Sequence, residues 1–220
     1  MEFCICITTI KQYKVALDIL IDSLPIEWKN KYILIYQNET ENNYKIFEDG
    51  HIEVYITNNI YDYGCFVGLD ILLNQNIINT NTWVLCIHDT CKFVGNNCAE
   101  LTYKLIEQYN SSNIDILWLC NTGQCNICLI RENAIKMGNT RYKDIQSMTK
   151  MESINYEHNF KLFLSPKSFN VQQFFINNRV KDLGRRCVYN NVNERVCLLY
   201  ESINMEKYFY HYINYHPFSP

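Results

Sequence analysis

Short apolar runs alternate with segments of helical periodicity over the first 120 residues. The first run, FCICITTI (Phe3 to Ile10), is nearly continuous and rich in β-branched residues, which is typical of a strand covered on both faces. VALDILIDSL (Val15 to Leu24) has apolar residues at helical spacing and stops before Pro25. The alternation continues with expected strands at 31–39, 51–59, 82–90 and 114–122 and expected helices at 64–74 and 96–110. This order predicts an α/β fold whose mostly parallel central sheet is flanked by crossover helices.

The pattern is less regular after residue 120. QCNICLIRENAIKMG predicts a strand followed by a short helix, and residues 144–164 are mixed, with helical parts. We expect a helix over 170–184 and a largely helical, aromatic-rich tail over 193–216. No internal repeat, low-complexity linker or charge block divides the chain. We therefore expect one domain over 1–220, with an α/β half at 1–120 and a more irregular half at 121–220.

Composition excludes several classes of protein. The chain has 20 basic and 23 acidic residues, and no Lys/Arg cluster is interleaved with aromatics, so we do not expect nucleic-acid binding. No apolar run approaches the roughly 18 residues of a membrane helix, and the N-terminus lacks the charge pattern of a signal peptide. We expect a soluble, cytoplasmic protein. Abundant Asn and Ile are typical of AT-rich codons, as in a large DNA virus, whose protein would work in the host cytoplasm, or a protist.

The 11 cysteines do not indicate a disulfide framework, because their number is odd and many lie inside apolar runs. We expect reduced thiols. Cys125 and Cys128 form one half of a zinc-ligand pattern, but a structural zinc site needs a second pair, which is missing.

Polar residues end each of the first four predicted strands, and in open α/β sheets ligands gather outside these carboxyl ends. The residues concerned, none of which is Lys or Arg, are Thr8, Thr9, Gln37, Asn38, Glu39, Asn58, Asn59, Tyr61, Asp62, His88, Asp89 and Thr90. The segment after the first strand, TTIKQYK, lacks the glycine fingerprint of a dinucleotide site, and the chain has no P-loop motif.

Over residues 1 to about 135, the order of the predicted strands and helices resembles the GT-A fold of nucleotide-sugar-dependent glycosyltransferases. NNIYDYGCFVGLDILLN occupies the place of the segment that leads into a helix under the sugar nucleotide. WVLCIHDTCKFVGN occupies the place of the Asp-x-Asp-like motif that holds a divalent metal on the diphosphate. The resemblance implies a GT-A-like domain that transfers a sugar from a nucleoside diphosphate sugar, above all a UDP-sugar, to a glycan or other hydroxyl acceptor. Residues 1–120 would then bind the donor and residues 121–220 the acceptor.

This chain departs from that motif, because His88-Asp89-Thr90 offers one carboxylate where the family has two. Mg²⁺ commonly binds through one or two carboxylates and substrate phosphate, and Mn²⁺ also accepts imidazole. The resemblance therefore implies that Asp89 binds Mn²⁺ or Mg²⁺ directly, that His88 assists, and that His216 completes the site as a late histidine. The alternatives are that His88 and Asp89 only end a strand and that His216 belongs to an aromatic tail packed on the sheet.

The resemblance also assigns roles around the nucleotide. Tyr61 would stack on the base and Asp62 would bind the ribose, although Asp62 followed by Gly64 is also ordinary turn chemistry. The full nucleotide-sugar site expected on this basis comprises Thr8, Thr9, Asn38, Tyr61, Asp62, His88, Asp89 and Thr90.

An inverting enzyme needs a general base within hydrogen-bond reach of the acceptor hydroxyl. In the segment KMESINYEHNF, Glu152 is the first candidate and Glu157 the second, and a solvated helix face is the alternative for each. We expect Asn121, Thr122 and Gly123 to line the acceptor side.

Two other functions remain open. A sugar nucleotidyltransferase on a related scaffold is disfavoured, because TTIKQYK is not the Gly- and Arg/Lys-rich loop such enzymes carry after the first strand. A catalytically degenerate domain that binds a glycan or partner stays open because the second carboxylate is missing.

Overall fold

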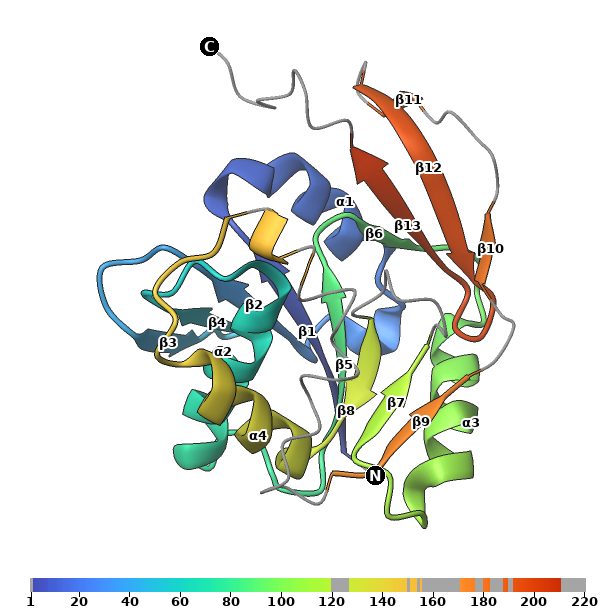
Figure 1. Ribbon diagram of the computed structural model, residues 1–220. Coiled ribbons are helices and arrows are strands. Elements are labelled where there is room, and N and C mark those ends of the chain that lie inside the picture. The colour runs from blue at the N-terminus through green and yellow to red at the C-terminus, as the bar shows by residue number, and fades with distance from the viewer. Residues whose placement is uncertain are drawn as a thin grey trace.

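The computed structural model describes residues 2–119, 127–149, 151–153, 155, 171–176, 180–182, 188–189 and 192–210. Its centre is an eight-stranded sheet with the strand order β3-β4-β2-β1-β5-β8-β7-β9 (Figure 1). The strands are β1 (Phe3–Thr9), β2 (Tyr32–Tyr36), β3 (Asn43–Ile46), β4 (Ile52–Tyr55), β5 (Trp83–His88), β7 (Ile116–Trp118), β8 (Cys128–Ile130) and β9 (Gln173–Phe175).

The sheet is mostly parallel, as the sequence predicted. Strands β4, β2, β1 and β5 pair in parallel, and so do β7 and β9. Strand β3 runs against β4 at one edge, and β8 runs against both β5 and β7. All seven residues of β1 and all six of β5 are buried, because both strands are covered on both faces.

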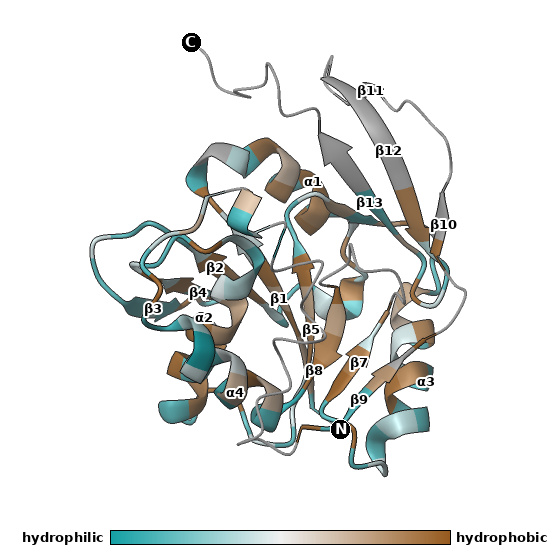
Figure 2. Cartoon of the chain, in the orientation of Figure 1, coloured by the Kyte–Doolittle hydropathy of each residue, from teal (hydrophilic) through white to brown (hydrophobic). Residues whose placement is uncertain are grey.

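Helices cover both faces of this sheet. Helices α2 (Gly64–Asn74) and α4 (Glu132–Tyr142) pack on one face, and α1 (Lys14–Ser23) and α3 (Cys98–Asn110) pack on the other. Alternate residues of β1 enter the two cores, with Cys4 and Cys6 on the α2/α4 side and Ile5 and Ile7 on the α1/α3 side. The short 3₁₀ helices between these elements are η1 (Lys11–Tyr13), η2 (Ile26–Trp28) and η3 (Tyr61–Tyr63). Figure 2 shows the apolar strands at the centre and polar residues on the outer turns.

A second sheet lies beyond β5, with the order β10-β12-β13-β6, and β11 pairs with β12. Its strands are β6 (Cys91–Phe93), β10 (Val180–Asp182), β11 (Val188–Tyr189), β12 (Val192–Tyr200) and β13 (Met205–Tyr210). Strand β6 follows β5 after a two-residue turn, so the chain passes from the first sheet to the second at Asp89 and Thr90. Tyr200 and Met205 belong to the same apolar core as α1 and α3.

The helices predicted over 170–184 and 193–216 are wrong wherever the structure describes these segments. They contain β9 and β10 in the first and β12 and β13 in the second. These segments form strands because β6 offers an edge with which β13 pairs, and β12 pairs with β13 in turn. The aromatic residues of MEKYFY are compatible with a strand but do not decide between strand and helix. The turn between β12 and β13 includes Asn204 at φ 49°, a conformation that favours Asn over most residues.

Candidate functional site

The candidate site lies where the strand order changes direction. From β1 the chain adds β2 and β4 on one side, then crosses to place β5 on the other side of β1. Crevices outside the carboxyl ends of strands at such a switch point are where ligands bind in open α/β sheets. The register pairs Thr8 at the end of β1 with His88 at the end of β5, so both predicted polar ends meet there.

Thr9 and Asp89 are joined directly. The Thr9 hydroxyl donates a hydrogen bond of 2.9 Å to Asp89 Oδ2, and both residues are buried. Burial raises the pKa of Asp89 to about 7 from its usual 3.8, against the opposing effect of the Thr9 hydrogen bond. A buried carboxylate with a raised pKa at a strand end is a common feature of functional sites.

A second carboxylate reaches the same edge from η3. Asp62 Oδ1 is in contact with His88 Nδ1, and its side chain is 20% exposed. The negative charge of Asp62 also contributes to the raised pKa of Asp89. The string His88-Asp89-Thr90 contains only one carboxylate. Asp62, from a separate segment of the chain, supplies a second carboxylate at the same edge of the sheet.

Gln37, at the end of β2, holds the segment that carries Asp62. Its amide nitrogen donates to the Tyr61 carbonyl at 2.6 Å, and its amide oxygen accepts from the Ile60 N–H at 2.8 Å. Tyr61 is held at φ 55°, in the left-handed region. Gly64 permits this contact, because a Cβ there would lie 2.7 Å from Gln37 Cδ.

Lys207 is a buried cation that the sequence reading missed. Lys207 lies on β13 and pairs with Cys91 of β6, which is the second residue after Asp89. The side chain of Lys207 is buried, and the residue is only 7% exposed. Its charge opposes the rise in the pKa of Asp89. No local signal in MEKYFY marks it, since only the pairing of β13 with β6 brings it to this edge.

The remaining predicted residues are spread more widely. Asn38 is exposed at φ 62°, and Thr90 is partly exposed in the turn after β5. Thr8 is buried, and its hydroxyl donates to the Ile87 carbonyl at 3.4 Å. Glu152 is exposed and forms a capping box with Thr149, whose N–H donates to Glu152 Oε2 at 2.7 Å. Glu157 and His216 lie outside the described residues.

No group of three or more His, Cys, Asp or Glu side chains is arranged as a metal site within the part of the chain that the structure describes. The donors at the switch point are two carboxylates, Asp62 and Asp89, and the imidazole of His88. These three side chains therefore do not form a metal-binding group by themselves, and a cation at this place would need further oxygen ligands, such as phosphate oxygens of a substrate.

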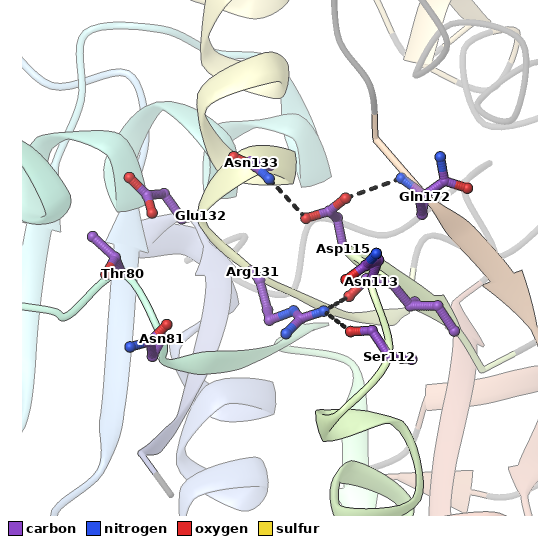
Figure 3. A pocket seen from close by; sticks show the side chains of 10 residues that line it. Thr80, Asn81, Ser112, Asn113, Asp115, Arg131, Glu132, Asn133 and Gln172 are labelled. Carbon is purple, nitrogen blue, oxygen red and sulfur yellow. Dashed lines mark hydrogen bonds between the residues drawn. The ribbon is translucent and has the colours of Figure 1, made fainter.

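A polar pocket of about 690 Å³ lies at the opposite, amino-terminal end of β5 (Figure 3). Arg131 lies over the Trp83 ring at 4.6 Å and donates to the carbonyls of Ser112 and Ile114. The buried Asp115 carboxylate accepts from the Asn133 amide and the Gln172 N–H. Asp115 and one terminal nitrogen of the Arg131 guanidinium thus join the loops at that end of the sheet, whereas Arg131 Nε is buried without a hydrogen-bond partner among the described residues.

The cysteines that the structure describes with their side chains are free, buried thiols, in agreement with the sequence prediction: Cys4, Cys6, Cys65, Cys86, Cys91, Cys98 and Cys128. Among the described residues, no helix is both long and apolar enough to cross a bilayer.

Comparisons with known proteins give little similarity. No protein-family model matches the chain, and no curated protein matches it. A solved structure of a cytidylyltransferase from Leptospira borgpetersenii serovar Hardjo-bovis (strain JB197) is similar at 12% sequence identity with a TM-score of 0.47, covering 81% of this chain and 77% of that one.

Proposed function

We propose that this protein is a glycosyltransferase that moves a sugar from a nucleoside diphosphate sugar, with UDP-sugars first, to a hydroxyl acceptor. The single observation that supports it is the convergence of Thr9, Asp62, His88 and Asp89 at the switch point of the sheet. That place suits a nucleotide, and the side chains suit a cation carried by a diphosphate.

The proposed chemistry is stabilisation of a leaving group. When the bond between sugar and phosphate breaks, negative charge grows on the departing nucleoside diphosphate. A divalent cation bound there, Mn²⁺ or Mg²⁺, would supply electrostatic stabilisation of that charge. Asp89 and His88 would hold it, with His216 as a further ligand, and the buried ammonium group of Lys207 would add positive charge beside Asp89.

The proposed acceptor step needs a base if the enzyme inverts configuration. Glu152 and Glu157 remain the candidates. Glu152 is already engaged by the Thr149 backbone N–H, which lowers the pKa of its carboxyl and leaves a weak base. We therefore place Glu157 before Glu152, which reverses the order expected from the sequence. We expect Glu157→Gln to abolish transfer and Glu152→Gln to reduce it less, measured as sugar transfer at saturating donor. Equal loss in both variants would exclude this ranking.

A binding experiment tests the proposal first. Thermal unfolding is measured with UDP, GDP and CDP sugars, each with and without Mn²⁺. We expect stabilisation by a nucleoside diphosphate sugar only when metal is present, because the diphosphate and the carboxylates need the cation between them. Asp89→Asn should remove this metal-dependent part. No stabilisation by any nucleotide would contradict the proposal and favour the degenerate binding domain.

A sugar nucleotidyltransferase is the second candidate, and Lys207 is the observation that favours it. The sequence offered no cation at these strand ends, and a triphosphate substrate needs one. The products separate the two reactions. Glycosyl transfer releases a nucleoside diphosphate, whereas nucleotidyl transfer from a triphosphate to a sugar phosphate releases pyrophosphate. Pyrophosphate formation with a nucleoside triphosphate and a sugar 1-phosphate would replace the first proposal with the second.

A further inference from the structure

The polar pocket at the amino-terminal end of β5 has charged side chains that the protein itself holds in place (Figure 3). The Arg131 guanidinium lies 4.6 Å from the centre of the Trp83 ring, and one of its terminal nitrogens donates to the carbonyls of Ser112 and Ile114. The buried Asp115 carboxylate accepts hydrogen bonds from a side-chain amide of α4 and from a backbone N–H. The charged groups are therefore positioned before any ligand binds.

Other polar groups of the pocket retain hydrogen-bonding capacity. Arg131 Nε is buried without a partner among the described residues, and a buried N–H of this kind calls for an acceptor. The side chains of Asn81 and Asn113 line the pocket and, within the described part of the chain, have no hydrogen-bond partner. Asn133 donates its amide N–H to Asp115, so its carbonyl oxygen points away from that carboxylate (Figure 3). Each carboxamide offers a donor and an acceptor.

The charges around the pocket are close to balance. Burial lowers the pKa of Arg131, and the negative charge of Asp115 opposes that effect, so the two charges act on each other. Glu132, on the first turn of α4, pairs with Lys136 one turn further along the helix. The N-terminal end of the helix adds only about half a positive charge. The balance disfavours a ligand that carries a net charge of either sign.

We propose that this pocket is a second binding site that takes a neutral, polyhydroxylated ligand, namely a sugar unit of a glycan. A hydroxyl group both donates and accepts, as a carboxamide does, so neighbouring hydroxyls of a sugar can pair with Asn81 and Asn133. A further hydroxyl oxygen would accept from Arg131 Nε, after a small shift of that buried group toward the pocket. The volume of about 690 Å³ lies within the usual range of ligand pockets.

The affinity of this site should be modest. Trp83 is fully buried beneath Arg131, so its ring cannot stack on a sugar, and hydrogen bonds in a pocket open to water contribute little net free energy. We therefore expect binding in the millimolar range, which suits a site that holds one unit of a longer chain and gains affinity from contacts elsewhere along it.

The first experiment observes the pocket directly. Two-dimensional ¹H–¹⁵N spectra resolve the arginine Nε–H signals, and Arg131→Lys identifies that of Arg131. The unmodified protein is titrated with the methyl β-glycosides of glucose, galactose, mannose and N-acetylglucosamine, and separately with sorbitol, inorganic phosphate and acetate. We expect a saturable shift of the Arg131 Nε–H signal with at least one glycoside and none with phosphate or acetate.

Three results of this titration would overturn the proposal. A panel in which no glycoside shifts the signal would mean that the pocket does not take a sugar. A larger response to phosphate or acetate would make it an anion site. A response to the open-chain sorbitol equal to that of every glycoside would reduce it to unspecific contact with hydroxyl groups.

The second experiment uses variants with the glycoside that binds best. We expect Asn81→Ala and Asn133→Ala each to weaken binding by about 2–10-fold, as for the net loss of a hydrogen bond. Asn96→Ala is the matched control, because Asn96 is exposed in the loop after β6 and does not line the pocket. If Asn133→Ala does not fold, Asn81→Ala suffices, since its side chain supports no described neighbour. Equal affinities in the pocket variants and the control would contradict the assignment.

This inference does not rest on the proposed function. The pocket is separated from Thr9 and Asp89 by the six residues of β5, which span about 20 Å. UDP with Mn²⁺ should therefore leave the Arg131 Nε–H signal unchanged. If glycosides bind here but no nucleotide binds, the proposed function fails and this site stands. If nucleotides bind but no glycoside does, the reverse holds.

Discussion

Asp89 is the residue on which the proposed site depends most, and its environment makes it sensitive to pH. Burial gives the folded protein a higher affinity for its proton than the unfolded chain has, because the pKa of Asp89 rises to about 7 from 3.8. The Thr9 hydrogen bond and Lys207 only partly offset the cost of burying the charge. A cation that binds Asp89 must therefore compensate for an unfavourable buried charge.

We expect the metal-free protein to lose stability as pH rises from about 4 to about 7. In this range the folded state retains the Asp89 proton that the unfolded state has released, so the free energy of unfolding falls by on the order of 1 kcal/mol per pH unit and levels off above pH 7. Urea unfolding in EDTA at several pH values, for the unmodified protein and Asp89→Asn, measures the effect. At each pH, the difference between the free energies of unfolding of the two proteins gives the contribution of Asp89. A difference that does not change with pH would contradict the raised pKa.

Lys207 offers a test of charge at the same place. If its ammonium group stabilises a bound diphosphate, Lys207→Met should weaken UDP binding by at least about tenfold, as expected for loss of a charge-assisted interaction. Lys92→Met is the matched control, because Lys92 alternates with Cys91 on β6 and points to the other face of that sheet. Calorimetry with UDP and Mn²⁺ makes the comparison. Equal affinities in the two variants would remove Lys207 from the site.

The packing of helix α2 against strand β2 holds the η3 segment of the candidate site in place. Helix α2 contains Gly64 and Gly68, which weaken an isolated helix, yet both lie where the helix approaches β2 closely. A Cβ at Gly68 would lie 2.5 Å from Ile35 Cδ1. These two glycines are thus what lets the helix lie against the sheet and carry η3 at its N-terminal end.

Gly138 makes the corresponding close contact between α4 and α2. A Cβ at Gly138 would lie 2.2 Å from Cδ1 of Phe66, whose ring is buried. We expect Gly138→Ala to destabilise the protein by about 1–3 kcal/mol, because overpacking outweighs the gain in helix propensity of up to about 1 kcal/mol. Urea unfolding measures this, and Phe66→Leu in the same chain should restore part of the loss. A net stabilisation by Gly138→Ala alone would show that α4 can move away without cost.

At the level of the whole molecule, the second sheet shares a core with the first. Tyr200, Ile203 and Met205 are buried together with residues of α1, β5 and α3. This shared core places Lys207 beside Asp89 and makes segment 192–210 part of the structure around the candidate site.

We expect Tyr200→Ala to destabilise the entire protein by about 3–5 kcal/mol, because removal of a fully buried aromatic side chain leaves a cavity in the shared core. Unfolding followed by tryptophan fluorescence and by far-ultraviolet circular dichroism should give coincident transitions at a lower denaturant concentration. Two separated transitions in the variant would mean that the second sheet unfolds independently of the first.

The pattern of apolar runs was sufficient to predict the α/β class, the strands from β1 to β8 other than the short edge elements β3 and β6, and the helices α1 to α4. Those elements carry strong local signals, because a strand buried on both faces is apolar throughout and a helix repeats every 3.6 residues. The same reading placed Thr8, Thr9, His88 and Asp89 at strand ends, since parallel strands bring their carboxyl ends to one edge.

Tertiary structure decided the rest, because it depends on partners distant in the sequence. Segments 192–200 and 205–210 are strands because β6 offers an edge for pairing, and propensity alone did not distinguish them from helices. The contact of Asp62 with His88 and the burial of Lys207 near Asp89 arise from residues 26 and 118 positions apart, respectively (88 − 62 and 207 − 89). Local periodicity carries no information about contacts at such separations, which form only when the packed sheets bring the side chains together.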